Sequence, residues 1–348
     1  MGTRTTQYKA IELCRISLII VLFGCIPFAC GDSNEITCPD TGQAEQIFFS
    51  FVENDSVRIA SISSDATDFK VIIEYGTLWA SPRGELLSYF SWNDVDETGS
   101  IYVSNLDGTL IKRISSNDPV ESHSIFPVLS PRKDAVVFFT YPHNLFLANI
   151  NGDGKILLAD DAENESIAAF SPAGNKIAYY GTEDKLNVIN SDGSGKIALT
   201  SSTYCYNDGF ACLEWSPDGG HIAYIGNDNG AADVCITSTD GAHSVNLTRD
   251  SVEDCWPAWS PNGNRLAYAG GNGYDIWIVN LSDSSKYNLT GTPDEYECFP
   301  QWSPDGRKIL YITLEPGAEG KGALTMIDVQ SKVKKTLYAN AFPGFWKK

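Results

Sequence analysis

The stretch Trp302-Ser303-Pro304-Asp305-Gly306 is the clearest member of a series of similar turns that runs through the chain. Two more full copies read Trp215-Ser216-Pro217-Asp218-Gly219 and Trp259-Ser260-Pro261-Asn262-Gly263. Six Ser-Pro turns, each followed by a hydrophobic run, begin at Ser81, Ser130, Ser171, Ser216, Ser260 and Ser303, with gaps of 49, 41, 45, 44 and 43 residues. Strand-rich units repeated every 40–45 residues or so are typical of a β-propeller. The sequence therefore predicts an all-β fold of four-stranded blades.

The two ends of the chain look like the parts of one further blade. Adding one period of 43 residues to Phe299-Pro300-Gln301-Trp302 leads to Phe342-Pro343-Gly344-Phe345. Subtracting 43 from Ser81 leads to Cys38, in a loose copy of the turn, and strand-like runs follow at 47–52, 57–62 and 69–73. We expect the C-terminal strand to pair with these runs, which would leave no long free edge. The prediction is seven blades, six complete and one shared; six and eight are the alternatives.

The first residues do not resemble a blade. Arg4, Lys9 and Arg15 precede an uncharged apolar stretch, 16–29, which is the pattern of a secretory signal. This divides the chain into a signal peptide at 1–29, a tether at 30–37 and a single propeller domain at 38–348. The signal resembles that of bacterial lipoproteins, which implies an exported protein, lipid-anchored at the periplasmic side or the surface of the outer membrane.

Two cysteines are candidates for the lipidated residue. Leu22-Phe23-Gly24-Cys25 fits the lipoprotein pattern better, whereas Pro27-Phe28-Ala29-Cys30 is followed by a polar tether. We favour Cys30, because it leaves an even number of cysteines, with Cys25 as the alternative. A cleaved signal without a lipid is the third reading.

The remaining cysteines permit disulfide bonds in an exported protein. Cys205 and Cys212 lie in one loop, and Cys255 and Cys298 stand at the same phase of neighbouring units, four residues before Trp259 and Trp302. Both pairs are candidate disulfides. The alternative is that some of these cysteines are buried thiols.

The charge of the chain is strongly negative. The formal net charge is −19 for 348 residues, and the positive signal peptide makes the mature chain still more acidic. This excludes nucleic acid and an anionic membrane surface as partners, apart from the lipid anchor itself. Basic proteins, cations and neutral glycans remain compatible with it.

The units Glu214-Trp215-Ser216-Pro217-Asp218-Gly219 and Gln301-Trp302-Ser303-Pro304-Asp305-Gly306 resemble the WD-like repeat of TolB, the periplasmic propeller of the Tol–Pal envelope system. The same repeat occurs in the propeller domains of prolyl-oligopeptidase-type peptidases and in oligogalacturonate lyases. The resemblance covers about residues 38–348, and its matching positions are turns and core residues, so it implies the fold rather than an activity. The chain departs from TolB in lacking the separate N-terminal α/β domain.

No catalytic constellation stands out in the sequence. It has no Gly-x-Ser-x-Gly pentapeptide, no His-Glu-x-x-His motif, no Walker loop and only four histidines. We therefore expect a non-catalytic protein without a metal or cofactor. A carbohydrate-binding or polysaccharide-degrading propeller, similar to the lyases, is the alternative.

One rim of the propeller should carry the longer connections, and binding residues concentrate on such loops. Three carboxylates stand five residues before the core aromatic of their unit, namely Glu165, Asp254 and Glu297. They could form a partial acidic ring at the channel mouth, which would attract a basic segment or a cation; alternatively they cap backbone amides. We predict that an envelope protein or peptide binds here, with a glycan as the alternative ligand. The candidate contact residues are Glu165, Tyr206, Asp254, Trp256, Glu297, Phe299 and His123.

Overall fold

The computed structural model confirms an all-β architecture. It describes residues 45–53, 56–78, 84–93, 98–115, 125–140, 144–162, 168–182, 185–200, 213–226, 231–292, 294–314 and 322–347. Within these ranges there are strands and turns but no helix, so none of the described segments is a helix able to cross a membrane. The predicted signal peptide, tether and Cys38 turn lie outside the described residues.

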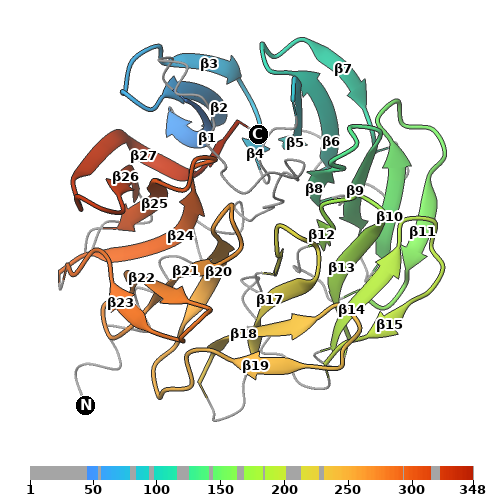
Figure 1. The fold of residues 1–348 in the computed structure, drawn as a ribbon. Coiled ribbons are helices and arrows are strands. Elements are labelled where there is room, and N and C mark those ends of the chain that lie inside the picture. The colour runs from blue at the N-terminus through green and yellow to red at the C-terminus, as the bar shows by residue number, and fades with distance from the viewer. Residues whose placement is uncertain are drawn as a thin grey trace, which may run out of the picture.

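Five of the sheets have four antiparallel strands each, and they are arranged around a common centre (Figure 1). In chain order these sheets are β4 (Thr77–Leu78), β5 (Leu86–Asn93), β6 (Thr98–Asn105) and β7 (Leu110–Arg113); β8 (Ile125–Leu129), β9 (Ala135–Thr140), β10 (Asn144–Asn149) and β11 (Ile156–Ala159); β12 (Ala168–Phe170), β13 (Lys176–Gly181), β14 (Lys185–Asn190) and β15 (Ile197–Ala198); β16 (Glu214–Trp215), β17 (His221–Gly226), β18 (Asp233–Ser238) and β19 (Ser244–Asn246); β20 (Cys255–Trp259), β21 (Arg265–Gly270), β22 (Asp275–Asn280) and β23 (Lys286–Asn288).

The sixth sheet joins the two ends of the chain. Its seven strands are, in spatial order, β24 (Tyr296–Trp302), β25 (Lys308–Leu314), β26 (Gly322–Asp328), β27 (Lys334–Trp346), β1 (Gln46–Glu53), β2 (Ser56–Ser63) and β3 (Lys70–Ile73). Strand β27 is long enough to pair with β26 through its first part and with β1 through its last part. The predicted pairing of the C-terminal strand with the N-terminal strands is therefore present. The seven-blade count stays a prediction.

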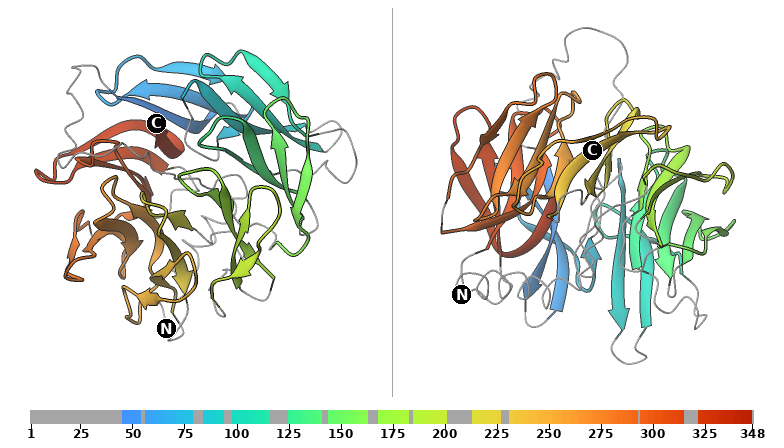
Figure 2. Two further views of the ribbon diagram at one scale, coloured as in Figure 1. Left: turned by 45° about the vertical axis from the view of Figure 1, so that its right-hand side comes forward. Right: turned by 90° about the horizontal axis from the view of Figure 1, so that it is seen from below.

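The sheets stand side by side around the ring, and the core lies between them (Figure 2). One continuous hydrophobic cluster includes residues from β1, β13, β20, β24 and β27. Middle strands are buried on both faces; β9, for instance, is buried at all six positions. This pattern is expected where each sheet packs against a neighbour on either side.

The repeated Ser-Pro turn is a hairpin held by its serine. At Ser216 the hydroxyl Oγ accepts the N–H of His221 at 2.9 Å, and the Ser216 carbonyl accepts the N–H of Gly219 at 2.9 Å. Gly219 has φ of 71°, which a glycine adopts without strain. The same bond from the residue five positions on reaches the hydroxyls of Ser171, Ser260 and Ser303. The motif that identifies the fold is thus structural.

The repeated tryptophans link each blade to the one before it. Four indoles donate to a main-chain carbonyl on the first strand of the preceding blade: Trp215 to Ala169 at 3.0 Å, Trp259 to Glu214 at 3.2 Å, Trp302 to Ala258 at 3.1 Å and Trp346 to Gln301 at 3.4 Å. All four acceptors directly precede the aromatic residue of their own strand. The predicted structural role of these aromatics is confirmed.

The last of these contacts corrects the register expected for the closing strand. The period of 43 residues aligns Phe345 with Trp302, but Trp346 takes this place and is 1% exposed. Trp346 follows Trp302 by 44 residues, as Trp259 follows Trp215, whereas Trp302 follows Trp259 by 43. The spacing of the units varies by one residue, so a constant period of 43 misses the position.

Replacing Trp346 tests how much the closing contact stabilises the ring. We expect Trp346→Ala to lower the free energy of unfolding by about 3–5 kcal/mol, since it opens a large cavity. Trp346→Phe should lower it by about 1 kcal/mol, through loss of the indole bond. Urea denaturation measures both changes. Val333→Ala, at a side chain 65% exposed, is the control and should have little effect; a Trp346→Ala variant as stable as this control would contradict the role of the contact.

Candidate functional site

One rim of the propeller collects the starts of the first and third strands of each blade and the ends of the second and fourth. In the blade β16–β19 this rim holds Asp233, the first residue of β18. The chain then leaves β19 and passes Asp250 and Asp254 before it enters β20. Antiparallel topology therefore brings these three aspartates together although up to 21 residues separate them in the chain.

Three hydrogen bonds hold the carboxylate of Asp233. We call the bonded set, Asp233, Asn246, Thr248 and Asp250, the bracket. Asn246 Nδ2 donates to its Oδ2 at 2.8 Å, while Thr248 Oγ1, at 3.2 Å, and the N–H of Asp250, at 3.3 Å, donate to its Oδ1. Asp233 itself is fully buried. Three donors on one buried carboxylate fix its position.

The next blade repeats the bracket 42 residues later. Asn288 Nδ2 donates to Asp275 Oδ2 at 2.7 Å, and the N–H of Thr292 donates to Asp275 Oδ1 at 2.8 Å. Thr290 Oγ1 lies 3.5 Å from the same oxygen. The bracket is thus a repeated structural device, and the two copies differ in one ligand-capable position, where Thr292 replaces Asp250.

Asp254 has a different environment from Asp233. It is 2% exposed, and its Oδ2 is buried without a hydrogen-bond partner. A Cβ on Gly270 would lie 1.9 Å from its Oδ1, so this carboxylate fits only because position 270 is a glycine. Burial, together with the charges of Asp250 and Asp233, raises the pKa of Asp254 to about 7, although Thr248 and Lys286 act in the opposite direction.

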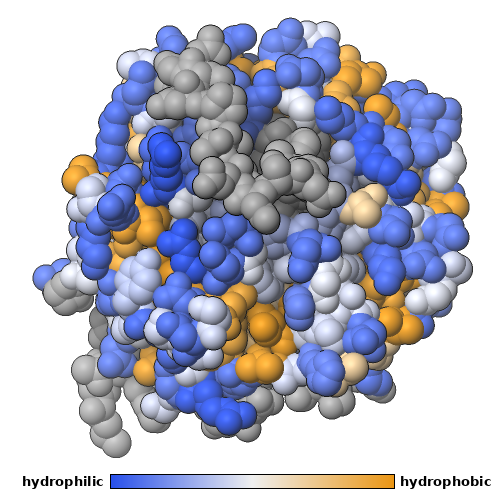
Figure 3. Space-filling model, in the orientation of Figure 1, coloured by the Kyte–Doolittle hydropathy of each residue, from blue (hydrophilic) through white to orange (hydrophobic). Residues whose placement is uncertain are grey.

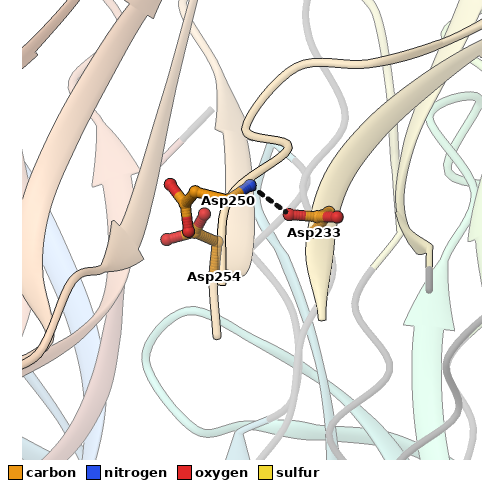
Figure 4. Close-up of side chains that lie close together, drawn as sticks. All are labelled: Asp233, Asp250 and Asp254. Atoms are coloured by element: carbon orange, nitrogen blue, oxygen red, sulfur yellow. Dashed lines mark hydrogen bonds between the residues drawn. The ribbon is translucent and has the colours of Figure 1, made fainter. Parts of the chain in front are cut away.

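The three carboxylates of Asp233, Asp250 and Asp254 form one cluster (Figure 4). Each offers an oxygen within 4.8 Å of the others, and the side chain of Asp250 is exposed. Carboxylate oxygens at this spacing are what hard divalent cations bind. Among the described residues these are the ones grouped in a way that could hold a metal ion.

Glu297 occupies the position in the second copy that Asp254 has in the first, and all its bonds are satisfied. Its Oε1 accepts from Lys334 Nζ at 3.0 Å and from Thr292 Oγ1 at 2.9 Å, and its Oε2 accepts the N–H of Ile276 at 3.3 Å. The side chain of Glu297 is fully buried. The ammonium group and the two further donors satisfy both oxygens of this buried carboxylate.

The structure places the expected contact residues in two groups. Glu165, Tyr206 and His123 lie outside the described residues, as do Cys25, Cys30, Cys205 and Cys212. Asp254, Glu297, Trp256 and Phe299 all lie at the expected rim, but each is less than a tenth exposed.

The expectation of an open acidic ring needs correction for the described carboxylates. Asp254 and Glu297 are buried and not open to the solvent, and Glu297 accepts the N–H of Ile276 on β22 of the preceding blade. Trp256 and Phe299 are likewise core residues, with ring centroids 4.6 Å apart. Both have positive φ, 54° and 59°, at the bulge that follows the first-strand cysteine.

The suggested bond between Cys255 and Cys298 is wrong: both are buried thiols, and no disulfide joins them. Each lies on the first strand of a different blade and packs into the hydrophobic core. Residues at the same position of the repeat lie at equivalent positions in two different blades, so an equal position in the repeat does not bring them into contact. Burial raises the pKa of the Cys255 thiol above its usual range.

Tyrosines and acids accessible to solvent surround these buried residues. Six of them, all exposed or half-buried, form a set that we call the acidic–aromatic rim: Asp250, Glu253, Tyr274, Asp294, Glu295 and Tyr296. Tyr274 and Tyr296 have centroids 6.4 Å apart, and the Tyr274 hydroxyl donates to Glu253 Oε2 at 3.0 Å. Elsewhere, hydrophilic side chains cover much of the face in Figure 3, and hydrophobic ones form small separate groups.

No protein-family model matches the chain, and no curated protein matches it in sequence. Solved structures do match. A putative TolB from Agrobacterium tumefaciens has 16% identity and a TM-score of 0.52, covering 77% of this chain and 99% of that one. TolB from Acinetobacter baumannii has 14% identity and a TM-score of 0.52, with 86% and 82% covered. An oligogalacturonate lyase from Vibrio parahaemolyticus has 12% identity and a TM-score of 0.60, with 85% and 86% covered. The chain therefore has a TolB-like propeller fold, and identities this low show the fold alone.

The pKa of Asp254 predicts a pH-dependent stability. Its value in the folded state, about 7, exceeds the ordinary 3.8, so folding favours the protonated form. The contribution of this group is full below pH 4 and is lost as the pH rises through 7. We expect wild type to lose about 3 kcal/mol relative to Asp254→Asn between pH 5 and pH 8.

Urea denaturation at several pH values in the presence of EDTA measures this difference. Asp283→Asn is the matched control, since hydrogen bonds from Ser285 lower the pKa of Asp283 and keep its titration below this window. Parallel pH profiles for wild type and Asp254→Asn would show that Asp254 is ionised without cost.

Proposed function

We propose that this chain is a non-catalytic, envelope-anchored propeller that binds a protein or peptide partner through the acidic–aromatic rim. The observation that carries the proposal is the pair of half-buried tyrosines, Tyr274 and Tyr296, flanked by acids on the connections of neighbouring blades. Tyrosine is enriched at binding hot spots, since it offers a large apolar area with a polar tip. Rigid blades hold these side chains in place, which lowers the entropy cost of binding.

The charge of the rim indicates the chemistry of the partner. Asp250, Glu253, Asp294 and Glu295 are acidic, and the whole chain has a formal net charge of −19. A partner with a basic segment would be attracted over a distance of about 10 Å at moderate salt. Tyrosine faces also bind lysine and arginine side chains favourably. The proposal is thus a basic, extended segment of an envelope protein.

The fold and the N-terminal sequence together support the proposed location. Two of the similar structures are TolB proteins, and residues 1–29 have the pattern of a lipoprotein signal. A lipid on the cysteine that follows the signal would tether the propeller to the membrane by a short polar segment. The partner would then be a protein of the same compartment.

Affinity capture from detergent-solubilised envelopes tests the binding surface. The bait is the tagged full-length chain, as wild type, as the double variant Tyr274→Ser/Tyr296→Ser, and as the control Leu110→Ser, at an exposed position on β7 of another blade. We expect a partner to be retained by wild type and control, to be lost at least about ten-fold with the double variant, and to bind more weakly at 0.5 M than at 0.05 M salt.

Two outcomes would overturn this proposal. Equal capture by wild type and the double variant would place the binding surface elsewhere. Absence of any protein partner, together with binding or cleavage of a polysaccharide by the purified chain, would favour the alternative of a carbohydrate-binding or lyase-like propeller.

The anchor is tested by replacing each candidate cysteine. We expect Cys30→Ser to release the chain from the membrane fraction and to abolish incorporation of labelled palmitate, because the acyl chains are the proposed membrane attachment. Cys25→Ser should leave both unchanged. The reverse result would assign the lipid to Cys25, and labelling of neither would leave a cleaved signal without a lipid.

A further inference from the structure

The geometry points to a divalent-cation site of the calcium class, formed by Asp233, Asp250 and Asp254 at the entrance to β20 (Figure 4). Such a site goes beyond partner binding at the rim, and of its three aspartates only Asp254 stands out in the repeat pattern of the sequence. It rests on four observations. The first two are the spacing of the carboxylate oxygens and the buried oxygen of Asp254 that has no hydrogen-bond donor. The other two are the close approach of Asp254 to Gly270 and the ammonium group of Lys334, which lies at the equivalent place in the next blade.

The spacing fits one ion among three carboxylates. The ligand oxygens all lie within 4.8 Å of one another, and oxygens bound to one calcium at about 2.3–2.6 Å are at most about 5 Å apart. Asp233 is fixed by its three donors. Asp250 is exposed, so it leaves a path for the ion and room for water ligands.

Asp254 supplies the second, independent observation. Its side chain is 2% exposed, and its Oδ2 accepts no hydrogen bond from any described residue. Buried carboxylate oxygens are normally bonded, because leaving one unpaired costs free energy. The missing Cβ at Gly270 lets this side chain occupy its position. A cation between Asp254 and Asp250 would satisfy the unbonded oxygen.

The neighbouring blade has the same bracket, and there the cation is the ammonium group of a lysine. There the ammonium group of Lys334 donates to Glu297 at 3.0 Å and lies 3.4 Å from Thr292 Oγ1. Lys334 begins the outer strand β27 of the following blade, just as Lys286 begins β23.

Lys286 does not replace the ion in the first copy. Its Nζ donates to the carbonyl of Thr248 at 2.8 Å instead of to Asp254. The first copy also has a carboxylate, Asp250, where the second has the neutral Thr292. Three carboxylates beside one ammonium group leave an excess negative charge that a divalent ion would neutralise. In the second copy, one lysine already balances Glu297.

Calcium titration of the full chain tests the site. The protein is stripped with EDTA, exchanged into chelator-free buffer at pH 7.5, and titrated with calcium chloride in a calorimeter, with magnesium chloride in parallel. We expect one ion per chain, and a melting temperature raised by about 4 °C at a hundred-fold excess of calcium over Kd.

Three variants make the result specific. Asp250→Asn removes an exposed ligand and should still fold, but should lower calcium affinity at least about ten-fold. Asp294→Asn removes an exposed carboxylate from the same rim outside the cluster and should leave the titration unchanged. The double variant Thr292→Asp/Lys334→Met gives the second copy three carboxylates and removes the ammonium group that is bonded to Glu297, so it should create a second calcium site.

The proposal is overturned if neither ion binds or shifts the melting temperature. It is equally overturned if Asp250→Asn binds calcium as wild type does, since the ion would then lie elsewhere. In either case the three aspartates would be only a hydrogen-bonded bracket of the strand entrance.

Discussion

The hydrogen bond from each tryptophan indole to the preceding blade is the interaction on which the ring depends. Each indole is buried between two sheets and donates to a main-chain carbonyl on the first strand of the preceding blade. The residue that directly follows this carbonyl is the core aromatic of that strand. An unpaired indole N–H at such a place would cost about 1–3 kcal/mol, so the contact fixes the relative position of neighbouring sheets. Trp346 extends this rule to the last strand, which also joins β26 to β1.

Much of the fold follows from the sequence because its repeated residues have local roles. Ser216 and Gly219 form a hairpin by short-range bonds, and such chemistry is visible in a few neighbouring letters. The error of one residue at Trp346 arises because the spacing between the tryptophans of neighbouring units alternates between 43 and 44 residues. The bulges of the first strands are not evident from the sequence either, because they involve positive φ at Trp256 and Phe299, two bulky residues that rarely adopt it.

The site was less predictable, since its chemistry depends on burial and on distant neighbours. The sequence shows that Asp254 and Glu297 stand at the same position of the repeat. It does not show that Asp254 has an oxygen without a hydrogen bond, or that Glu297 is bonded to Lys334, 37 residues later. The bracket does have a sequence pattern, because in two adjacent units an aspartate is followed 13 residues later by Asn-Leu-Thr. That Asp250 replaces Thr292 at the end of this pattern is visible only when the two units are aligned.

The rigid frame of hydrogen bonds explains how the chain tolerates a buried, partly unsatisfied carboxylate. Asp233 and Thr248 are bonded in the same way as their counterparts in the next blade, and the N–H of Asp254 donates to the carbonyl of Ala232, so these bonds fix the backbone from which the Asp254 side chain projects. Asp250 lies in both the cluster and the acidic–aromatic rim. A cation held there would reduce the negative charge that faces a basic partner, and a basic partner would weaken the hold on the cation. By linkage the two effects must be equal in free energy, so the proposed ion and the proposed partner would oppose each other through this one residue.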